Sequence, residues 1–267
     1  MYCAVAPQRM DSESRDDRSA AGTGTAPHPV LTKYYERESD RRSFVSALFD
    51  STARHYDRIN ELGSMGSGRF YRRWILTEYG LHTGMKLLDV ATGTGLVAQA
   101  ATSILREPQA VVGLDPSIGM LRQAQKALAI PLVQGRVEEL PFATDHFDFL
   151  SMGYALRHMA DLGVAFRECL RVLKPGGRFL ILEITPPRSA VGRYVVRMYF
   201  ESVLPRLMRL GTGSAEAELL VRYYWDTITH CVTPDVILGA LRSSGFVDAQ
   251  YRARVGLLSE YVGAKPC

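Results

Sequence analysis

Residues 87–95 read LLDVATGTG, a short apolar run that leads directly into a turn of small residues. The apolar run predicts a buried β-strand, and the turn residues mark its end. Gly93 and Gly95 carry no Cβ, so the backbone can bend sharply there and bring N–H groups against a ligand at the start of a helix. The segment therefore predicts a strand, a ligand-binding turn and a helix.

A second apolar run, residues 110–114, ends in Asp115, twenty residues after Gly95. An acidic residue at this distance binds ribose hydroxyls in nucleotide-binding folds. Residues 93–98 also fit the G-x-G-x-x-A form of the dinucleotide fingerprint. An ordinary strand-to-helix turn is the alternative explanation of the glycines, and Asp115 in register favours a nucleoside site over it.

The glycine fingerprint alone does not identify the ligand. A nicotinamide-binding domain usually opens near the N-terminus of its fold, whereas here a helical segment precedes the strand. Asp89, just before the turn, carries a carboxylate that can anchor a water molecule or an amino-acid ammonium group. This context distinguishes the chain from a nicotinamide-binding domain.

Composition bounds the class of protein. The 267 residues are 46% hydrophobic, enough for one large domain with additional segments. The formal net charge is +4, and basic residues are interleaved with acidic ones, which argues against nucleic acid as a partner. The four cysteines show no C-x-x-C spacing, so we expect neither a disulfide framework nor a bound metal.

The N-terminal segment is typical of neither a secretory signal nor a mitochondrial transit peptide. It lacks a long apolar core, and it mixes acidic with basic residues between Asp11 and Arg18. No run of the sequence is long enough to span a bilayer. We therefore expect a cytoplasmic protein, and contact with the inner face of a membrane stays open.

Composition and periodicity divide the chain into three parts. Residues 1–30 are rich in Ser, Gly, Ala, Pro and charged residues, which predicts a disordered tail. Residues 31–80 place apolar side chains at three- and four-residue spacings, which predicts a helical cap. Residues 81–267 form the third part, in which helices at about 187–230 interrupt the sheet as a lid.

Strands and helices alternate along the third part. Strands are expected near residues 86–90, 110–114, 130–134, 147–152 and 178–184, followed by a closing antiparallel hairpin of residues 247–253 and 256–263. Helices are expected at 118–128 and 162–173, in the lid at 189–210 and 215–230, and in a segment that ends at Ser243. The alternation predicts an α/β fold with a parallel sheet and helices on both faces.

Several motifs together resemble the class I S-adenosylmethionine-dependent methyltransferases. They are Asp89 to Gly95, Val111 to Asp115, Val137 to Phe142, Phe147-Asp148, Leu156-Arg157 and, above all, Arg171 to Gly177. Within that superfamily, nearly everything after residue 45 is similar to the ubiquinone/menaquinone C-methyltransferases. The resemblance implies a Rossmann-like sheet, mostly parallel, with an N-terminal helical cap and an inserted helical lid.

The resemblance also implies S-adenosyl-L-methionine as the cofactor. Within the glycine turn, which holds Asp89, Gly93 and Gly95, Thr94 matches a family contact to the cofactor. Asp115 matches the acid that binds the ribose.

Four further cofactor contacts follow from the resemblance. Arg136 and Val137 match the pair on the adenine side, where the family commonly has Asp or Asn in place of Arg136. Gly153 follows the fourth strand, at a position where the family often has Ser. Tyr56, with Asp57, lies in the cap and is expected to close over the cofactor.

Methyl transfer needs an acceptor that is aligned, dry and electron-rich, because the sulfonium is already a strong electrophile. The family places an Arg, here Arg157, beside the substrate, and His158 follows it where Asn is more usual. His158 is the candidate acceptor for a phenolic proton. The alternatives are a salt bridge from Arg157 to Asp161 and a surface position for His158.

Three functions stay open at this point. The first is C-methylation of a prenylated benzoquinol or naphthoquinol, and the second is methylation of another small aromatic or polyketide metabolite. The third is a non-catalytic protein that keeps the nucleoside pocket for regulation. Apolar residues of the 191–199 stretch, flanked by Arg193 and Arg197, suit a membrane surface or a lid helix packed on the core. A homodimer is also left open.

Overall fold

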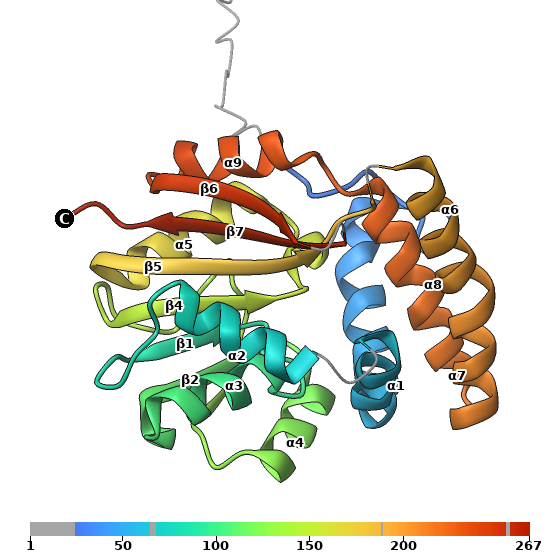
Figure 1. Ribbon diagram of the computed structural model, residues 1–267, viewed down its shortest axis with the longest axis horizontal. Helices are drawn as coiled ribbons and strands as arrows, with labels where there is room; N and C mark the ends of the chain where they lie inside the picture. Colours follow the sequence, from blue (N-terminus) through green and yellow to red (C-terminus); the bar gives the residue numbers. More distant parts are fainter. Residues whose placement is uncertain (1–24, 65–67, 188, 255–256) are drawn as a thin grey trace, which may run out of the picture.

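The computed structural model describes residues 25–64, 68–187, 189–254 and 257–267. Within these residues, seven strands form one sheet in the order β3-β2-β1-β4-β5-β7-β6 (Figure 1). The strands are β1 (Leu87–Val90), β2 (Val111–Asp115), β3 (Leu132–Gln134), β4 (Phe147–Gly153), β5 (Leu173–Ile184), β6 (Val247–Arg254) and β7 (Leu258–Ala264).

The pairing of the strands confirms the predicted fold class. Strands β1 to β5 are parallel, and β7 is antiparallel to both β5 and β6. The closing hairpin therefore does not simply extend the sheet, because β7 inserts between β5 and β6. Strand β5 begins at Leu173, earlier than expected, because residues 173–177 already lie in the strand.

Helices cover both faces of the sheet. The nine α-helices of the described chain are α1 (Glu38–Ser64), α2 (Gly68–Glu78), α3 (Leu96–Leu105), α4 (Ile118–Ala127), α5 (Leu162–Val172), α6 (Ala190–Met198), α7 (Leu204–Thr212), α8 (Ala215–His230) and α9 (Pro234–Ser243). Apolar residues of α2 and α3 share one core cluster with one face of the strands. Those of α5 and α9 share another cluster with the opposite face. Two packed faces explain why the parallel strands are buried almost throughout.

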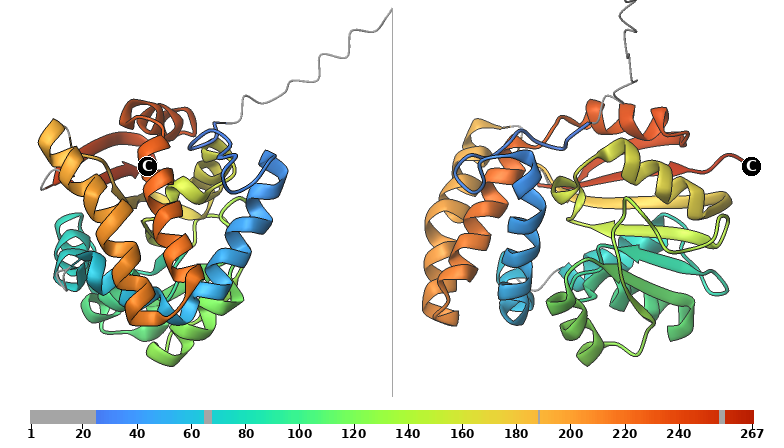
Figure 2. Two further views of the ribbon diagram at one scale, coloured as in Figure 1. Left: turned by 90° about the vertical axis from the view of Figure 1, so that its right-hand side faces the viewer. Right: turned by 180° about the vertical axis from the view of Figure 1, so that it is seen from behind.

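A separate helical layer lies beyond the carboxyl ends of the parallel strands. Helices α1, α8 and the α6–α7 pair run side by side there (Figures 1 and 2). Their inward apolar residues form a third core cluster, which includes Leu48, Leu220 and Tyr223. The stretch expected as one helix over 189–210 contains a π-helical segment, Tyr199–Val203, between α6 and α7. The role of this layer as a lid stays a prediction.

Two expectations about the N-terminal part change. Helix α2 falls within the predicted cap, yet it packs on the sheet face with α3. Residues 1–24 of the predicted tail lie outside the described residues, but residues 25–30 are not a disordered tail. Their backbone accepts hydrogen bonds from Leu162 and Val232, and the His28 side chain is 1% exposed. These long-range contacts have no signature in local composition.

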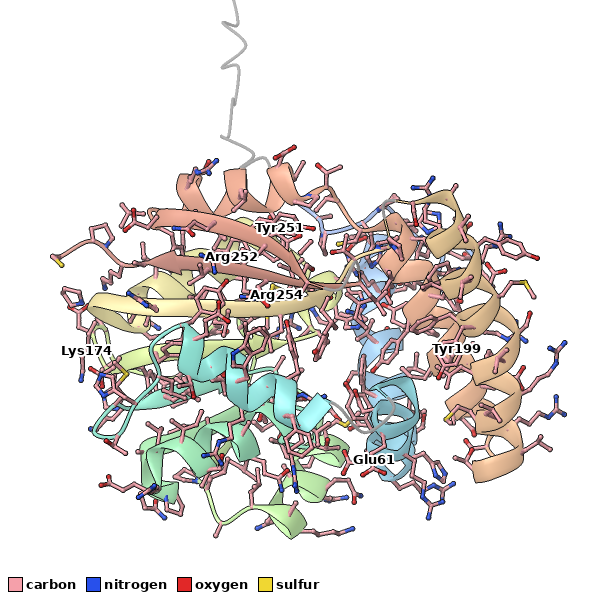
Figure 3. The ribbon with its side chains drawn as sticks, viewed as in Figure 1. Glu61, Lys174, Tyr199, Tyr251, Arg252 and Arg254 are labelled. Atoms are coloured by element: carbon pink, nitrogen blue, oxygen red, sulfur yellow. The ribbon has the colours of Figure 1, made fainter. Side chains whose placement is uncertain are left out.

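Two arginines of strand β6, at the edge of the sheet, form ion pairs with α2. Arg252 and Arg254 point from β6 toward α2, and both pair with Glu78, at 3.2 Å and 2.5 Å (Figure 3). Arg254 also pairs at 3.0 Å with Glu260, a fully buried carboxylate that accepts a hydrogen bond from the Tyr79 hydroxyl. This network holds the sheet edge against the helix that precedes the glycine turn.

None of the described helices is both long and apolar enough to cross a membrane.

Candidate functional site

A cavity of about 920 Å³ opens at the carboxyl ends of the parallel strands. Its walls are the segments that follow β1, β2, β3 and β4, together with residues of α1. Strand order reverses between β1 and β4, and open α/β sheets bind ligands outside the strand ends at such a switch point. The volume is that of a site for a small molecule or a cofactor, about 300–1,000 Å³.

The glycine turn supplies one wall of this cavity. Gly93 lines it with φ 59°, and a Cβ at that position would lie 4.0 Å from the ring of Tyr56. Gly95, with φ 89°, lies behind the wall, where an added Cβ would come within 2.5 Å of Leu128. Gly93 therefore leaves room for a ligand, whereas Gly95 allows α3 and α4 to pack closely.

Asp115 lies at the end of β2 with its carboxylate at the cavity wall. One oxygen accepts a hydrogen bond from the Gly93 N–H and the other from the Ser117 N–H, each at 2.8 Å. Burial raises the pKa of Asp115 to about 6, against the opposing effect of these two N–H groups. Each oxygen has a second lone pair, so the carboxylate fits a pair of donating ribose hydroxyls.

Asp89 lies beneath the turn and not in the cavity wall. It accepts hydrogen bonds from Thr92 at 2.6 Å, from Ser151 at 2.7 Å and from the Ala98 N–H at 3.2 Å. Ser151 is its register partner on β4, so the sheet itself sets this contact. Burial raises the pKa of Asp89 to about 6. In this arrangement Asp89 holds the turn in shape.

The residues predicted on the adenine side line the cavity together. Arg136 and Val137 follow β3, Gly153 ends β4, and all three contribute to the wall. The Arg136 side chain pairs with Glu138 at 3.3 Å. A Cβ on Gly153 would come within 2.7 Å of Val97, which explains why this chain has Gly there.

Helix α1 closes the site from the opposite side. Tyr56 contributes to the cavity wall, and Asp57 accepts a hydrogen bond of 2.5 Å from Thr94. About two turns earlier on α1, Asp50 accepts from the Ser117 hydroxyl at 2.5 Å and from the Gly119 N–H at 2.9 Å. Two carboxylates of α1 thus bind the two loops that carry Gly93 and Asp115.

His158 reaches the cavity from the short 3₁₀ helix Leu156–His158. Its ring stacks on Tyr223 with centroids 5.5 Å apart and meets Phe49 edge-on at 5.2 Å. Both ring nitrogens are buried, and neither has a hydrogen-bond partner among the described residues. Burial, with a smaller effect of Arg157, lowers the pKa of His158 well below its ordinary value. The imidazole is therefore neutral at pH 7 and able to accept a proton.

Arg157 does not line the cavity in this structure. Its side chain is 2% exposed, pairs with Glu183 at 2.6 Å and donates from Nε to Thr227 at 3.1 Å. The alternative of an ion pair with Asp161 is wrong, because Asp161 caps α5 by accepting from the Val164 N–H. Arg157 instead joins β4, β5 and α8 directly behind His158.

The cavity also contains residues that the sequence analysis did not name as site residues. Arg41 and Phe49 of α1, Tyr154 after β4 and Met159 all contribute to its wall. Tyr154 has φ 62°, a left-handed conformation unusual for a non-glycine residue. No sequence signal marked Arg41, because it lies in a run of charged residues that reads as a solvated helix face.

The Asp115 carboxylate, the open backbone at Gly93 and the cavity of about 920 Å³ fit a nucleoside cofactor with a second molecule beside it. Among solved structures, the fold is similar to a putative S-adenosyl-L-methionine-dependent methyltransferase from Methanococcus maripaludis, with a TM-score of 0.60, 17% identity, and coverage of 82% of this chain and 94% of that one. It is also similar to a methyltransferase from Thermotoga maritima described as a possible histamine N-methyltransferase, with a TM-score of 0.58, 17% identity and coverage of 82% and 99%. At these identities the likeness concerns the fold.

Comparison of sequences gives relatives of higher identity than these solved structures. The chain is 32% identical to the ubiquinone/menaquinone biosynthesis C-methyltransferase UbiE of Shewanella woodyi, over 84% of this chain and 92% of that protein. It is also 32% identical to the protein of the same name from Shewanella sediminis, over 86% and 92%. The family model of the ubiE/COQ5 methyltransferases matches residues 35–265. The chain therefore belongs to the ubiE/COQ5 methyltransferase family, and it is a methyltransferase that uses S-adenosyl-L-methionine.

Proposed function

We propose that this enzyme transfers the methyl group of S-adenosyl-L-methionine to a ring carbon of a prenylated benzoquinol or naphthoquinol. The names of its relatives support this class of acceptor. The observation that carries the proposal is His158, a neutral imidazole that contributes to the cavity wall and whose two buried nitrogens have no hydrogen-bond partner among the described residues. Such a group suits an acceptor that must lose a phenolic proton before its ring becomes nucleophilic.

The cofactor residues divide into two groups in this proposal. Asp115 accepts the ribose hydroxyls, the backbone at Gly93 approaches the cofactor, and Tyr56 covers it from α1. The segment of Arg136 and Val137 faces the adenine, and Gly153 borders the same space.

Asp89, Thr94 and Gly95 support the cofactor indirectly, because they hold the turn and α3 in place without lining the cavity.

When bound, the cofactor would supply an electrophilic methyl group and would be released as a neutral thioether. His158 takes the proton of the acceptor's hydroxyl, which makes the ring carbon electron-rich enough to accept that methyl group. The ring proton at that carbon is then lost to solvent, which restores aromaticity, and His158 returns its proton to the oxygen. The net products are the methylated quinol, the thioether and one proton.

Arg157 is a positioning residue in this scheme. Its ion pair with Glu183 and its hydrogen bond to Thr227 fix the backbone that carries His158. The aromatic contacts with Phe49 and Tyr223 fix the plane of the imidazole. Orientation of this kind is what methyl transfer needs from the protein.

We also propose that the outer face of α6 and α7 contacts a membrane surface. Val191, Tyr194 and Leu210 are 75%, 66% and 86% exposed there. Arg197 and Arg206 lie on the same two helices. An apolar face with arginines beside it suits the interface of an anionic bilayer, which is also where a prenylated acceptor resides.

The test of the function is methyl transfer from labelled S-adenosyl-L-methionine to a prenylated hydroquinone that lacks the ring methyl group, with products separated by mass. Label on a ring carbon is expected, and His158→Gln is expected to reduce turnover about 100-fold with little change in cofactor affinity. Label on hydroxyl oxygen, or on other small phenols but not on quinols, assigns the enzyme to a different aromatic acceptor. Cofactor binding without transfer to any of them favours a non-catalytic role.

A further inference from the structure

Arg41 is a buried cation at the wall of the cavity that the proposed mechanism has not used. It lies near the start of α1 and is 2% exposed. One terminal nitrogen donates to Glu38 at 2.9 Å. The other lies 2.9 Å from both the His28 ring and the Arg157 carbonyl oxygen. The guanidinium is therefore held in a fixed orientation by three residues, Glu38, His28 and Arg157.

The remaining donor of this guanidinium has no acceptor. Arg41 Nε is buried and has no hydrogen-bond partner among the described residues. A buried donor without a partner is costly, and an arginine donor more so because it carries charge. Arg41 contributes to the cavity wall, but Nε itself is covered, so a molecule bound in the cavity reaches this donor only after a small movement of the side chains around it.

The groups that surround Arg41 leave part of its charge uncompensated. Glu38 is its only ion-pair partner among the described residues, and that side chain is 46% exposed. Burial, followed in size by the effect of Arg41, lowers the pKa of His28 to about 4, so His28 is neutral at pH 7. Arg157, from the 3₁₀ helix, is already paired with Glu183 of β5.

Two tyrosines complete the surroundings of Arg41. Tyr35 precedes α1 and Tyr223 belongs to α8, and burial raises the pKa of both phenols. Neither hydroxyl has a hydrogen-bond partner among the described residues. Both tyrosines are therefore neutral at pH 7 and do not balance the guanidinium. Among the described residues, Glu38 is therefore the one anion that pairs with Arg41, and it balances the buried charge only in part.

His158 by itself is poorly matched to the proton that it must accept. A phenol has an ordinary pKa of about 10, and the pKa of His158 is lowered below its usual range. Transfer between such groups is strongly uphill unless a nearby cation stabilises the phenolate. Arg41 and His158 both line the cavity, and Arg41 donates a hydrogen bond of 2.9 Å to the carbonyl oxygen of Arg157, the residue before His158, so the two residues lie beside each other in the cavity wall.

We propose that Arg41 binds the hydroxyl oxygen of the aromatic acceptor through Nε and holds it as an oxyanion, while His158 receives its proton. This inference rests on the proposed function and adds its oxygen-binding residue. It also restricts the acceptor, because a ring without a hydroxyl group beside the methylated carbon, or conjugated with it, leaves Arg41 Nε unpartnered. Rings that carry only ether oxygens are therefore poor acceptors.

The test uses 4-nitrocatechol, an aromatic diol whose absorption moves to longer wavelength when its hydroxyl ionises. The probe is bound to the full chain saturated with S-adenosylhomocysteine, so no methyl transfer is needed, and its absorption is followed against pH. In the wild type the pKa of the bound probe is expected to fall by about 1–3 units below that of the free probe. Arg41→Met is expected to return it to the free value.

Two variants serve as controls. Arg58→Met removes an exposed arginine from the same helix and is expected to leave the pKa of the probe at the wild-type value. His158→Gln is expected to keep the lowered pKa of the probe while reducing turnover, because the cation is still present. Thermal unfolding and affinity for S-adenosylhomocysteine verify that each variant is folded.

Three results overturn the inference: a wild-type protein that does not bind the probe, one that binds it without lowering its pKa, and an Arg41→Met variant that keeps the wild-type shift. If Arg41→Met does not fold, Arg41→Lys replaces it. A smaller shift in Arg41→Lys than in the wild type supports the role of Nε, and an unchanged shift contradicts it. If the probe shifts as expected but no quinol is methylated, the oxyanion site stands and the proposed acceptor is wrong.

Discussion

Asp115 connects the pH of the solution to cofactor binding. Its pKa is raised from 3.8 to about 6 by burial, so the carboxylate loses its charge as the pH falls through 6. In the cofactor-free protein the folded state binds this proton more tightly than the unfolded state does. The stability that this carboxyl contributes is therefore fully present below about pH 4 and is lost as the pH rises through 6.

We expect cofactor binding to have the opposite dependence on pH, because in the proposed assignment the ribose hydroxyls donate to the charged form of Asp115. We expect the affinity for S-adenosyl-L-methionine to be constant above pH 7 and to fall about tenfold per pH unit below 6. Asp115→Asn is expected to weaken binding at pH 7 by about tenfold to a hundredfold and to flatten this dependence. Calorimetric titration between pH 5 and 8 measures both effects.

The control for this prediction is Asp145→Asn, which changes a carboxylate that is 48% exposed and paired with Lys265 far along the chain. Its affinity profile is expected to match that of the wild type. An affinity that does not change between pH 5 and 7 in the wild type contradicts the ribose assignment of Asp115.

Arg157 and Glu183 form a buried ion pair. The free energy of unfolding of variants at these two positions distinguishes a structural role of Arg157 from a catalytic one. Arg157→Met leaves the Glu183 carboxylate buried without its cation, so we expect a loss of about 3–5 kcal/mol in the free energy of unfolding. Arg157→Met with Glu183→Leu is expected to recover most of that loss, because no unpaired charge remains. Urea unfolding measures the free energies.

Arg167→Met on the exposed side of α5 is the matched control, with an expected change within about 0.5 kcal/mol. A double variant as unstable as Arg157→Met alone would show that the pair is not the source of the loss.

At the scale of elements, α1 is a long helix held to the cofactor loops by few contacts. Asp50 binds Ser117 and the Gly119 N–H, and Asp57 binds Thr94. The loops that these bonds join carry the Gly93 and Asp115 walls of the cavity. We expect the cofactor to leave past α1, which lines the cavity, so that the strength of these contacts sets its dissociation rate.

We expect Asp50→Ala and Asp57→Ala each to raise the dissociation rate constant of S-adenosyl-L-methionine by about fivefold or more, which corresponds to a lost hydrogen bond of about 1 kcal/mol. Stopped-flow displacement of the bound cofactor measures the rate. Glu61→Ala, at an exposed position of the same helix (Figure 3), is expected to dissociate at the wild-type rate. Equal rates in all four proteins would mean that α1 does not gate the cofactor.

At the scale of the whole molecule, the sheet and the helical layer have different structural roles. The sheet brings the cofactor residues to its carboxyl edge, and the layer of α1, α8 and the α6–α7 pair covers that edge (Figures 1 and 2). The outer side of the layer carries exposed apolar residues of α6 and α7. The molecule thus has the cavity on one side of the layer and exposed apolar side chains on the other.

The membrane contact can be tested with vesicles that contain an anionic phospholipid. Val191→Glu combined with Leu210→Glu is expected to weaken vesicle binding at least about tenfold, because it removes two apolar side chains and adds negative charge. The control is Val236→Glu on α9, whose side chain is 40% exposed on another face. Equal vesicle binding by all variants contradicts the proposal, and wild-type protein that sediments as a dimer without binding vesicles assigns the surface to a second copy of the chain.

The local sequence was sufficient for the parts of the fold that depend on neighbouring residues. The apolar runs ending at Asp89 and Asp115 predicted β1 and β2, and the glycines between them predicted the turn at the cavity. These features are readable because strand burial and backbone freedom are properties of short segments. Family resemblance then added Arg136, Val137, Gly153 and His158, all of which line the cavity.

Contacts between distant segments could not be derived in this way. Residues 25–30 read as a tail because their composition is polar, yet they pack against α5 and the segment after α8. Arg157 was expected to touch the substrate or to pair with Asp161. Its partner proved to be Glu183, which a different strand supplies. Asp89 was expected in the site and lies beneath it, because its register partner Ser151 accommodates it within the sheet.

The sequence by itself thus determined the strands, the glycine turn, the place of Asp115 at the end of β2 and the family, because each is encoded by neighbouring residues or by a motif of fixed spacing. Only the tertiary structure decided which charges are buried, which are paired and which face the cavity. Arg41 is the clearest case, since it meets the Arg157 carbonyl across 116 positions of sequence and keeps one donor unpartnered. The physical reason is that burial and hydrogen-bond satisfaction depend on the packing of the whole chain, which no local pattern records.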